Sequence, residues 1–379
     1  MSVDRSLIAV TANPMLELAL REKLRRRAET AGSLGELEPL AVRLGLIAST
    51  LRPRFESPQI VVVAADHGLA VDGVGALGAS QHLSTAQLVA SVLAGQLPLS
   101  VFAASQGLGL TVVDAGVAET VAPHPRLLAR KIAHGTRNAR VNSAMSLERA
   151  QAAIRAGMEI GDALPGNAVA CAGIGVGALE SAALLLSRLT GAKIRDLVAA
   201  GPSMKQDDLA RLLMLLQGAL QRHRDITEPV ELLAALGGFE VAMMVGLMLV
   251  AAGKRHLIIA DGMPAYAALM IASRIAPAVT DYCVFSRSHT HQGLDHALAE
   301  FHTSALLELG MESTDGTGAT LAWPLLSSAA ALLTDVADGE VPALATRPAS
   351  FDEPSAFASS RFAPDAGREQ HAKTVPGLL

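Results

Sequence analysis

Residue types that could hold a phosphate and remove a proton gather in two glycine-rich segments of the 379-residue chain. The first reads GIGVGA at residues 173–178, after an apolar run and before a helix-length stretch. Glycines in such a turn let the backbone approach a phosphate, and the N–H groups that open the helix supply donors. The segment also fits the GxGxxA pattern of dinucleotide sites, and glycines that only allow a helix to pack closely are a third interpretation.

The second segment, DGTGA at residues 315–319, carries one carboxylate directly before an uncharged stretch at residues 316–334. A carboxylate beside apolar walls can serve as a general base. An equally good interpretation is that Asp315 caps the following helix, because its side-chain oxygen can accept from free helix N–H groups. Asp315 is therefore a candidate base or a structural cap.

Two further polar segments close apolar runs. GPSMK at residues 201–205 offers a hydroxyl and an ammonium at a helix start, which could bind a phosphate or only cap the helix. HTHQGLDH at residues 289–296 contains metal-ligand residue types, but no metal motif is completed, so we expect a polar loop and no metal site. The GxSxG, Walker A and HExxH motifs do not occur in the sequence, which leaves lipase-like hydrolysis, P-loop chemistry and zincin proteolysis without support.

The composition of the chain argues against two classes of binding partner. The chain has 31 basic and 36 acidic residues, a net charge of −5, and only 3% aromatic residues, so we expect neither nucleic acid nor an anionic membrane as a partner. Two cysteines in apolar surroundings favour a reducing compartment, and the expected localisation is cytoplasmic. The uncharged windows at residues 73–113 and 316–334 are interrupted by polar residues or proline, so no membrane span is expected.

Short apolar runs alternate with helix-length stretches through the middle of the chain, a pattern typical of a parallel sheet covered on both faces. Ligands of such sheets bind outside the carboxyl ends of the strands, so the polar residues that close the runs are the candidate site. The expected strands cover residues 60–66, 99–105, 110–116, 168–175, 196–203, 256–262 and 281–286. The expected helices cover residues 85–94, 146–163, 179–189, 206–223, 239–252 and 265–275.

A series of motifs along most of the chain resembles the nicotinate-nucleotide:dimethylbenzimidazole phosphoribosyltransferase family. GSLGELE at residues 32–38 is similar to the family's GSLGxLE, and DGTGA at residues 315–319 is similar to its GEGSGA. The other matching segments are VVVAADHG at residues 61–68, VVDAGV at 112–117, HGTRN at 134–138, SAM at 143–145, GGFE at 237–240, DGM at 261–263 and RIAP at 274–277. The chain departs from the family where Asp315 replaces a catalytic Glu and where AGIGVGALE, residues 172–180, replaces GExGxxNTT.

The resemblance implies an α/β fold with a Rossmann-like, doubly wound, mostly parallel sheet and a second, smaller helical domain. It also implies a homodimer and no cofactor. The expected boundaries are 1–55 for N-terminal helices of the small domain, 56–300 for the large α/β domain, 301–346 for C-terminal helices that carry the Asp315 loop and complete the small domain, and 347–379 for an irregular tail.

The reaction that the resemblance implies moves ribose 5-phosphate from nicotinate mononucleotide to a benzimidazole-type base, giving α-ribazole phosphate and nicotinate in cobalamin lower-ligand synthesis. Asp315 would be the catalytic base. The expected nucleotide- and phosphate-binding residues are Gly173, Gly175, Gly177, Glu180, Gly201, Ser203, Lys205, Gly316, Thr317 and Gly318, and the expected base-binding residues are Asp66, His67, Thr85 and Gln87. The departures leave open a catalytically silent paralogue that binds a nucleotide or an azole. The GxGxxA pattern at residues 173–178 leaves open a dinucleotide-dependent enzyme as a second alternative.

Overall fold

The apolar runs form a sheet whose six described strands are all parallel, as the sequence pattern predicts. The structure, a computed structural model, describes residues 8–74, 83–198, 204–288, 293–311, 313 and 315–336. The strands are β1 (Gln59–Ala65), β2 (Gly109–Gly116), β3 (Leu127–Ala129), β4 (Ala168–Ile174), β5 (Leu257–Ala260) and β6 (Cys283–Phe285).

The order of the strands is β3-β2-β1-β4-β5-β6, which is the order of a Rossmann sheet. The chain runs outward from β1 to one edge and then returns to continue from β4 to the other edge. β1 and β4 are hydrogen-bonded neighbours from Gln59 opposite Val169 to Ala64 opposite Ile174. The direction of winding therefore reverses between β1 and β4, and such a switch point is where open α/β sheets bind ligands.

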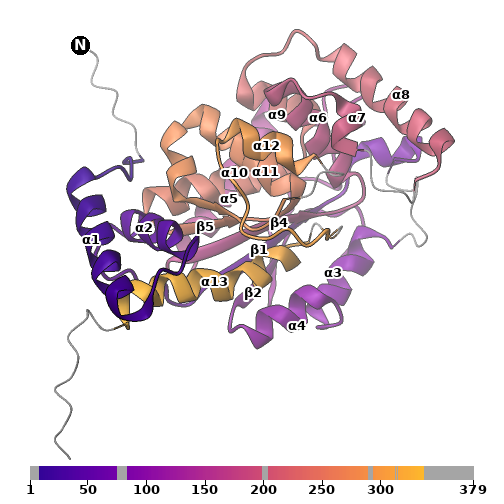
Figure 1. Cartoon of the computed structure of the whole chain (residues 1–379). Helices are drawn as coiled ribbons and strands as arrows, with labels where there is room; N and C mark the ends of the chain where they lie inside the picture. Colours follow the sequence, from indigo (N-terminus) through magenta and orange to yellow (C-terminus); the bar gives the residue numbers. More distant parts are fainter. Residues whose placement is uncertain are drawn as a thin grey trace, which may run out of the picture. The chain divides into compact units, whose positions relative to one another are not determined.

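Helices cover both faces of the sheet (Figure 1). One face carries α3 (Thr85–Leu93), α4 (Pro98–Ser105) and α13 (Thr317–Thr334), and the other carries α5 (Leu147–Ala163), α10 (Phe239–Gly253) and α11 (Gly262–Ile275). Because the central strands are covered twice, they are apolar along almost their whole length and are buried. The remaining elements are η1 (Gly68–Asp72), α6 (Ala178–Thr190), α7 (Ile194–Val198), α8 (Gln206–Arg222), α9 (Pro229–Leu236), η2 (Pro277–Tyr282) and α12 (Leu294–Glu300).

The two ends of the described chain come together in a helical layer. α1 (Pro14–Ala31) and α2 (Leu37–Ile47) pack against each other, and both contact α13 (Figure 1). The expected small domain would consist of these helices, while its boundaries at residues 55 and 300 stay a prediction. The tail at residues 347–379 lies outside the described residues.

Two of the expected strands are wrong. Residues 98–105 form α4, with Pro98 at its start and with Leu99 and Ala103 buried four residues apart on one helical face. Residues 194–198 form α7, and the rest of that expected strand lies outside the described residues. Short apolar runs fit either a buried strand or a buried helix, so periodicity alone does not separate the two. The short edge strand β3 was not expected, because a three-residue strand carries little pattern.

Candidate active site

A glycine loop, defined here as residues 175–177, follows β4 at the switch point and lies against the end of β1. Gly175 has a φ of +151°, and a Cβ atom at this position would lie 1.7 Å from the carbonyl oxygen of Ala65. Only glycine fits so close to the neighbouring strand. The backbone N–H of His67 donates to the carbonyl oxygen of Val176 at 3.1 Å, which ties the loop to the residues after β1.

Asp66 and Thr85, two expected base-binding residues, connect this loop to its surroundings. Asp66 Oδ1 accepts a hydrogen bond from the Thr85 hydroxyl, and Oδ2 accepts one from the Ala118 N–H at 2.7 Å. Thr85 Oγ1 in turn accepts from the Val176 N–H at 2.9 Å. Both carboxylate oxygens of Asp66 and the buried hydroxyl of Thr85 are thus bonded within the chain, where they fix the glycine loop relative to α3 and β2.

His67, a third expected base-binding residue, lies under the glycine loop and is buried. Its Nε2 is 3.1 Å from Oε1 of Glu240, the second residue of α10. Burial alone would lower the pKa of His67, but the charge and hydrogen bond of Glu240, with the charges of Glu180 and Asp66, raise it overall. The second oxygen of Glu240, Oε2, is buried and has no hydrogen-bond partner among the described residues.

Asp315 comes directly before α13, which covers the opposite face of the sheet from α10 (Figure 1). Its Oδ1 accepts hydrogen bonds from the Thr317 N–H at 3.1 Å and from the Thr317 hydroxyl at 2.6 Å. Oδ2 receives no hydrogen bond from the part of the chain that the structure describes. A Cβ atom on Gly316 would lie 2.8 Å from Ile60 Cδ1 and 3.0 Å from Ala172 Cβ. Gly316, in the segment named here the Asp315 loop (residues 311–318), therefore packs against β1 and β4. The carboxylate therefore binds the start of the helix with one oxygen, and its other oxygen has no donor among the described residues.

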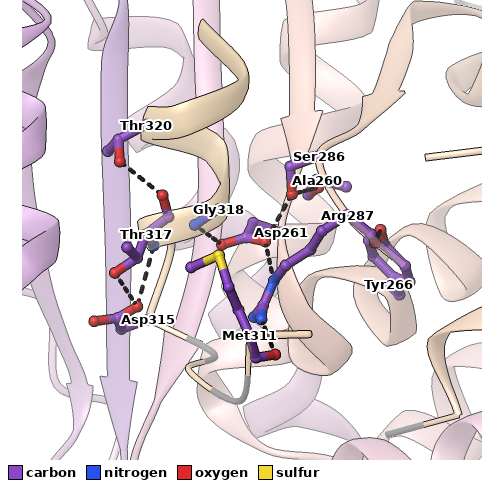
Figure 2. Close-up of polar contacts among 10 residues, drawn as sticks. All are labelled: Ala260, Asp261, Tyr266, Ser286, Arg287, Met311, Asp315, Thr317, Gly318 and Thr320. Atoms are coloured by element: carbon purple, nitrogen blue, oxygen red, sulfur yellow. Dashed lines mark hydrogen bonds and ion pairs between the residues drawn. The ribbon is translucent and has the colours of Figure 1, made fainter. Parts of the chain in front are cut away.

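A buried ion pair lies beside this loop (Figure 2). Asp261, which follows β5, accepts through Oδ1 from Arg287 Nε at 2.7 Å and from the Ser286 hydroxyl at 2.6 Å. Its Oδ2 accepts from the Gly318 N–H at 2.9 Å. Arg287 also donates through Nη1 to the carbonyl oxygen of Met311 at 2.6 Å.

The two helix starts at the strand ends differ in what they offer an anion. At α13, the N–H groups of Thr317 and Gly318 already donate to carboxylates of the chain itself. At α6, no described residue accepts a hydrogen bond from the N–H of Gly177 or of Leu179. Because a phosphate needs free donors at a helix start, α6 is the better place for it.

The departure from the family motif around Gly173 has a structural counterpart. Gly173 is buried, and a Cβ atom there would lie 2.8 Å from Pro264 Cβ, 3.0 Å from Met244 Cε and 3.2 Å from Glu240 Cγ. The space that a side chain at this position would need is therefore filled by its neighbours. Glu180 lies in the first turn of α6 and is partly exposed.

The remaining expected site residues are less informative. Gln87 is exposed, and its side-chain oxygen accepts from the Ser84 N–H at 2.8 Å in a capping box at the start of α3. Lys205 is exposed at the start of α8. Gly201 and Ser203 lie outside the described residues.

Sequence reasoning did not assign a role to Glu240, Asp261 or Arg287, although all three are completely buried. A signal was available for two of them, since Asp261 follows the apolar run before it and Arg287 closes the next one. A charged residue that ends a predicted parallel strand is a candidate for the ligand edge of the sheet. Glu240 gave no such signal, because its partner His67 is 173 residues away.

Two other expectations bear on the site. Among the described residues, no group of three or more His, Cys, Asp or Glu side chains could hold a metal ion, and part of the histidine-rich loop, residues 289–292, is not described. The stretch 85–105 is long and apolar enough for one membrane span by composition alone. It is, however, divided into α3 and α4, which pack on the sheet as part of the fold.

Comparisons with known proteins agree with this architecture. A sequence profile described as Phosphoribosyltransferase matches residues 10–341. The nicotinate-nucleotide–dimethylbenzimidazole phosphoribosyltransferase of Cupriavidus taiwanensis is 42% identical over 327 residues, covering 86% of this chain and 92% of that protein. The protein of the same name from Variovorax paradoxus is 40% identical over 325 residues, with the same coverage of 86% and 92%.

A solved structure with that name, from Thermus thermophilus, superposes with a TM-score of 0.78 at 29% identity and covers 85% of this chain and 96% of its own. The expected fold class, a Rossmann-like sheet with a smaller helical domain, is confirmed. The similarity spans nearly all of the described residues, including both glycine-rich segments. The chain belongs to the nicotinate-nucleotide–dimethylbenzimidazole phosphoribosyltransferase family.

Proposed function

We propose that the protein transfers ribose 5-phosphate from nicotinate mononucleotide to a ring nitrogen of a benzimidazole-type base, giving α-ribazole phosphate and nicotinate. The observation that carries the proposal is the state of Asp315. One of its oxygens is fixed by Thr317, and the other is left without a donor among the described residues, beside the switch point of the sheet. The names of the family members supply the substrate class.

The proposed chemistry needs one base. As the azole nitrogen attacks the anomeric carbon, its N–H proton passes to Asp315 Oδ2, and the new C–N bond forms with inversion. The bond from that carbon to the nicotinate ring breaks, and its electron pair neutralises the pyridinium nitrogen, so the leaving group needs no proton. A positioned base of this kind commonly contributes about 10²–10⁴-fold to a rate.

The hydrogen bonds to Thr317 matter because Asp is one methylene shorter than the family's Glu, a loss of reach on the order of 1.5 Å. A short side chain has fewer rotatable bonds, and its orientation is set by the two donors on Oδ1. The packing of Gly316 on Ile60 and Ala172 places the backbone itself against the sheet. We propose that the base binds within reach of Oδ2 on this side of the strand ends.

The nucleotide phosphate would bind at the start of α6. The N–H groups of Gly177, in the glycine loop, and of Leu179, in the first turn of α6, have no acceptor among the described residues. Gly175 allows the loop to lie against β1. In this proposal Gly316, Thr317 and Gly318 shape the Asp315 loop, and they do not bind the phosphate, because two of their three N–H groups are occupied.

We further propose the assembly and location that the family resemblance implies, a homodimer in the cytoplasm with residues 1–55 and 301–346 forming the small domain. Both cysteines are buried, and burial raises the pKa of each thiol, which suits reduced, unreactive side chains. Light scattering after size-exclusion chromatography tests the dimer. The expected mass is twice the chain mass of 39.1 kDa. A monomer at micromolar concentration would contradict it.

The function is tested by mixing the purified protein with nicotinate mononucleotide and dimethylbenzimidazole and following nicotinate release by chromatography. Release that requires both substrates is expected. No release with dimethylbenzimidazole or with several other azoles would contradict the proposal. Calorimetry on the same samples would then separate a protein that still binds the azole from one that does not.

A further inference from the structure

The buried ion pair between Asp261 and Arg287 has no part in the chemistry proposed above, yet it contacts the Asp315 loop at two points. Both side chains are completely buried, and they come from neighbouring strand ends, after β5 and β6. Arg287 Nε donates to Asp261 Oδ1 at 2.7 Å. The pair is itself held in place, because Ser286 donates to the same carboxylate oxygen and the Tyr266 hydroxyl donates to the carbonyl oxygen of Arg287 at 2.5 Å.

Each partner of the ion pair is hydrogen-bonded to a backbone group on one side of Asp315. Arg287 Nη1 donates to the carbonyl oxygen of Met311, four residues before Asp315, at 2.6 Å. Asp261 Oδ2 accepts from the N–H of Gly318, three residues after it, at 2.9 Å. Figure 2 shows the carboxylate and the guanidinium side by side, between the start of α13 and Met311. One ion pair therefore fixes where the Asp315 loop begins and where it ends.

The fit between the pair and the helix start is tight. A Cβ atom on Gly318 would lie 2.5 Å from Asp261 Oδ1 and 2.9 Å from Arg287 Cδ. The first turn of α13 can approach the pair this closely only because residue 318 is a glycine. A shift of Asp261 or Arg287 would accordingly be transmitted to the backbone on both sides of Asp315.

Stability alone is a weak reason for this arrangement. Removing two charges from water is costly, and an apolar pair of similar volume is often as stable as a buried ion pair. Arg287 Nη2 is buried without a hydrogen-bond partner among the described residues, which adds a further cost. What the ion pair supplies that apolar side chains would not is directed hydrogen bonding to two backbone groups of one loop.

We propose that Asp261 and Arg287 are positioning residues that hold Asp315 Oδ2 at the place where the azole proton is removed. This inference rests on the proposed function. It predicts that loss of either partner lowers kcat while leaving the KM for nicotinate mononucleotide nearly unchanged, because the nucleotide phosphate binds at the other helix start. The two residues should also act as one unit.

The test compares Arg287→Met, Asp261→Asn and the double variant with a matched control, Arg255→Met. Arg255 is a partly buried arginine that, like Arg287, donates to backbone carbonyl oxygens, those of Leu46 and Ile47, but it does not contact the Asp315 loop. Each variant is assayed for kcat and KM, and hydrogen exchange is followed in the peptide that covers residues 311–318. A retained near-ultraviolet circular dichroism spectrum shows that a variant is folded.

We expect kcat to fall at least about 10-fold in Arg287→Met and in Asp261→Asn, with the KM for nicotinate mononucleotide within about threefold of wild type. The kcat of the double variant should be no lower than that of the less active single variant, because removing either partner already breaks the same ion pair. Exchange at residues 311–318 should accelerate in these variants and stay unchanged in Arg255→Met. With an active wild type, an unchanged kcat in Arg287→Met would overturn the positioning role.

The outcome is distinguishable from failure of the proposed function. If the wild type releases no nicotinate with any azole, the transferase proposal fails, and the exchange experiment alone decides whether the pair orders the loop. Unchanged exchange in Arg287→Met would then overturn the inference as well. Faster exchange confined to Arg287→Met and Asp261→Asn would support the ordering of the loop without the chemistry.

Discussion

The imidazole of His67 and the carboxylate of Glu240 form a buried pair 3.1 Å apart, directly under the glycine loop at the switch point of the sheet. The pair connects the end of β1 to the start of α10, which covers the opposite face of the sheet from α13, the helix that follows Asp315 (Figure 1). The protonation state of His67 therefore affects a structural connection beneath the expected phosphate site. It also gives the protein a pH dependence with a definite sign.

The free energy of unfolding should fall as the pH rises above about 6.5. The pKa of His67 is raised in the folded protein because the nearby carboxylates outweigh burial, so its contribution is fully present below the unfolded pKa of about 6.5 and is lost as the pH rises through the folded pKa. Each unit of difference between the two pKa values corresponds to about 1.4 kcal/mol. Urea unfolding from pH 6 to pH 9 measures the effect.

The matched variant for this prediction replaces both partners, His67→Gln with Glu240→Gln, so that no buried charge is left alone. Its pH dependence should be flatter than that of the wild type over the same range. The background from other groups, such as His256, whose pKa is lowered by burial and by Lys254, cancels in the comparison. Equal slopes for the two proteins would contradict a charged His67.

Asp315→Asn should retain the fold and lose turnover. Asn keeps the size of the side chain, and its oxygen can still accept from Thr317, but it cannot take a proton. We expect kcat to fall about 10²–10⁴-fold with a small change in the midpoint of urea unfolding. A variant that keeps wild-type nicotinate release would exclude Asp315 as the base.

Thr85→Val should weaken nucleotide binding. The substitution removes the hydroxyl that donates to Asp66 and accepts from Val176, so the glycine loop loses one of its anchors. We expect the KM for nicotinate mononucleotide to rise several-fold and the free energy of unfolding to fall by about 1–3 kcal/mol, because buried partners are left unpaired. Thr334→Val is the control, since that hydroxyl bonds only within the end of α13 and to Asp335. Equal effects of the two variants would argue against the anchoring role.

Gly173→Glu should destabilise the protein and should not improve turnover, although it restores the family's residue type at that position. The new Cβ would meet Pro264 at 2.8 Å, and the new carboxylate would be placed beside buried Glu240. Overpacking alone costs about 1–3 kcal/mol, and a second buried charge adds to this. Gly253→Ala, where nothing lies within 4 Å, serves as the neutral control in urea unfolding. A stable and faster Gly173→Glu enzyme would show that the pocket still accepts the family's carboxylate.

The sequence predicted the strands and helices that carry a clear apolar period. β1, β4 and β5 are long or fully buried apolar runs closed by a polar or glycine residue, and all three lie where they were expected. The prediction for residues 99–105 was wrong because an apolar run of this length is typical of a buried strand. Pro98, which favours a helix start, was the signal for the helix. The position of Asp315 in a glycine turn before α13 was also predictable from the order of the residues.

The sequence alone could not show which polar groups are hydrogen-bonded to each other and are therefore not free to bind a ligand. The connection of Asp66 to Thr85 and Val176 joins residues up to 110 positions apart, and it turns two expected ligand contacts into internal hydrogen bonds. The ion pair between Asp261 and Arg287 likewise forms because β5 and β6 are neighbours in the sheet. Pairings of this kind are set by topology, and local residue patterns do not encode them.

The proposed role of Asp315 as the base depends most directly on the distance between its Oδ2 and the nitrogen of a bound azole. A crystal structure of the full chain with dimethylbenzimidazole measures it. We predict that the base binds at the carboxyl ends of β1 and β4, with Oδ2 about 2.6–3.2 Å from a ring nitrogen. A base bound elsewhere, or an Asp315 carboxylate turned away from the bound ring, would contradict the proposed role of this residue.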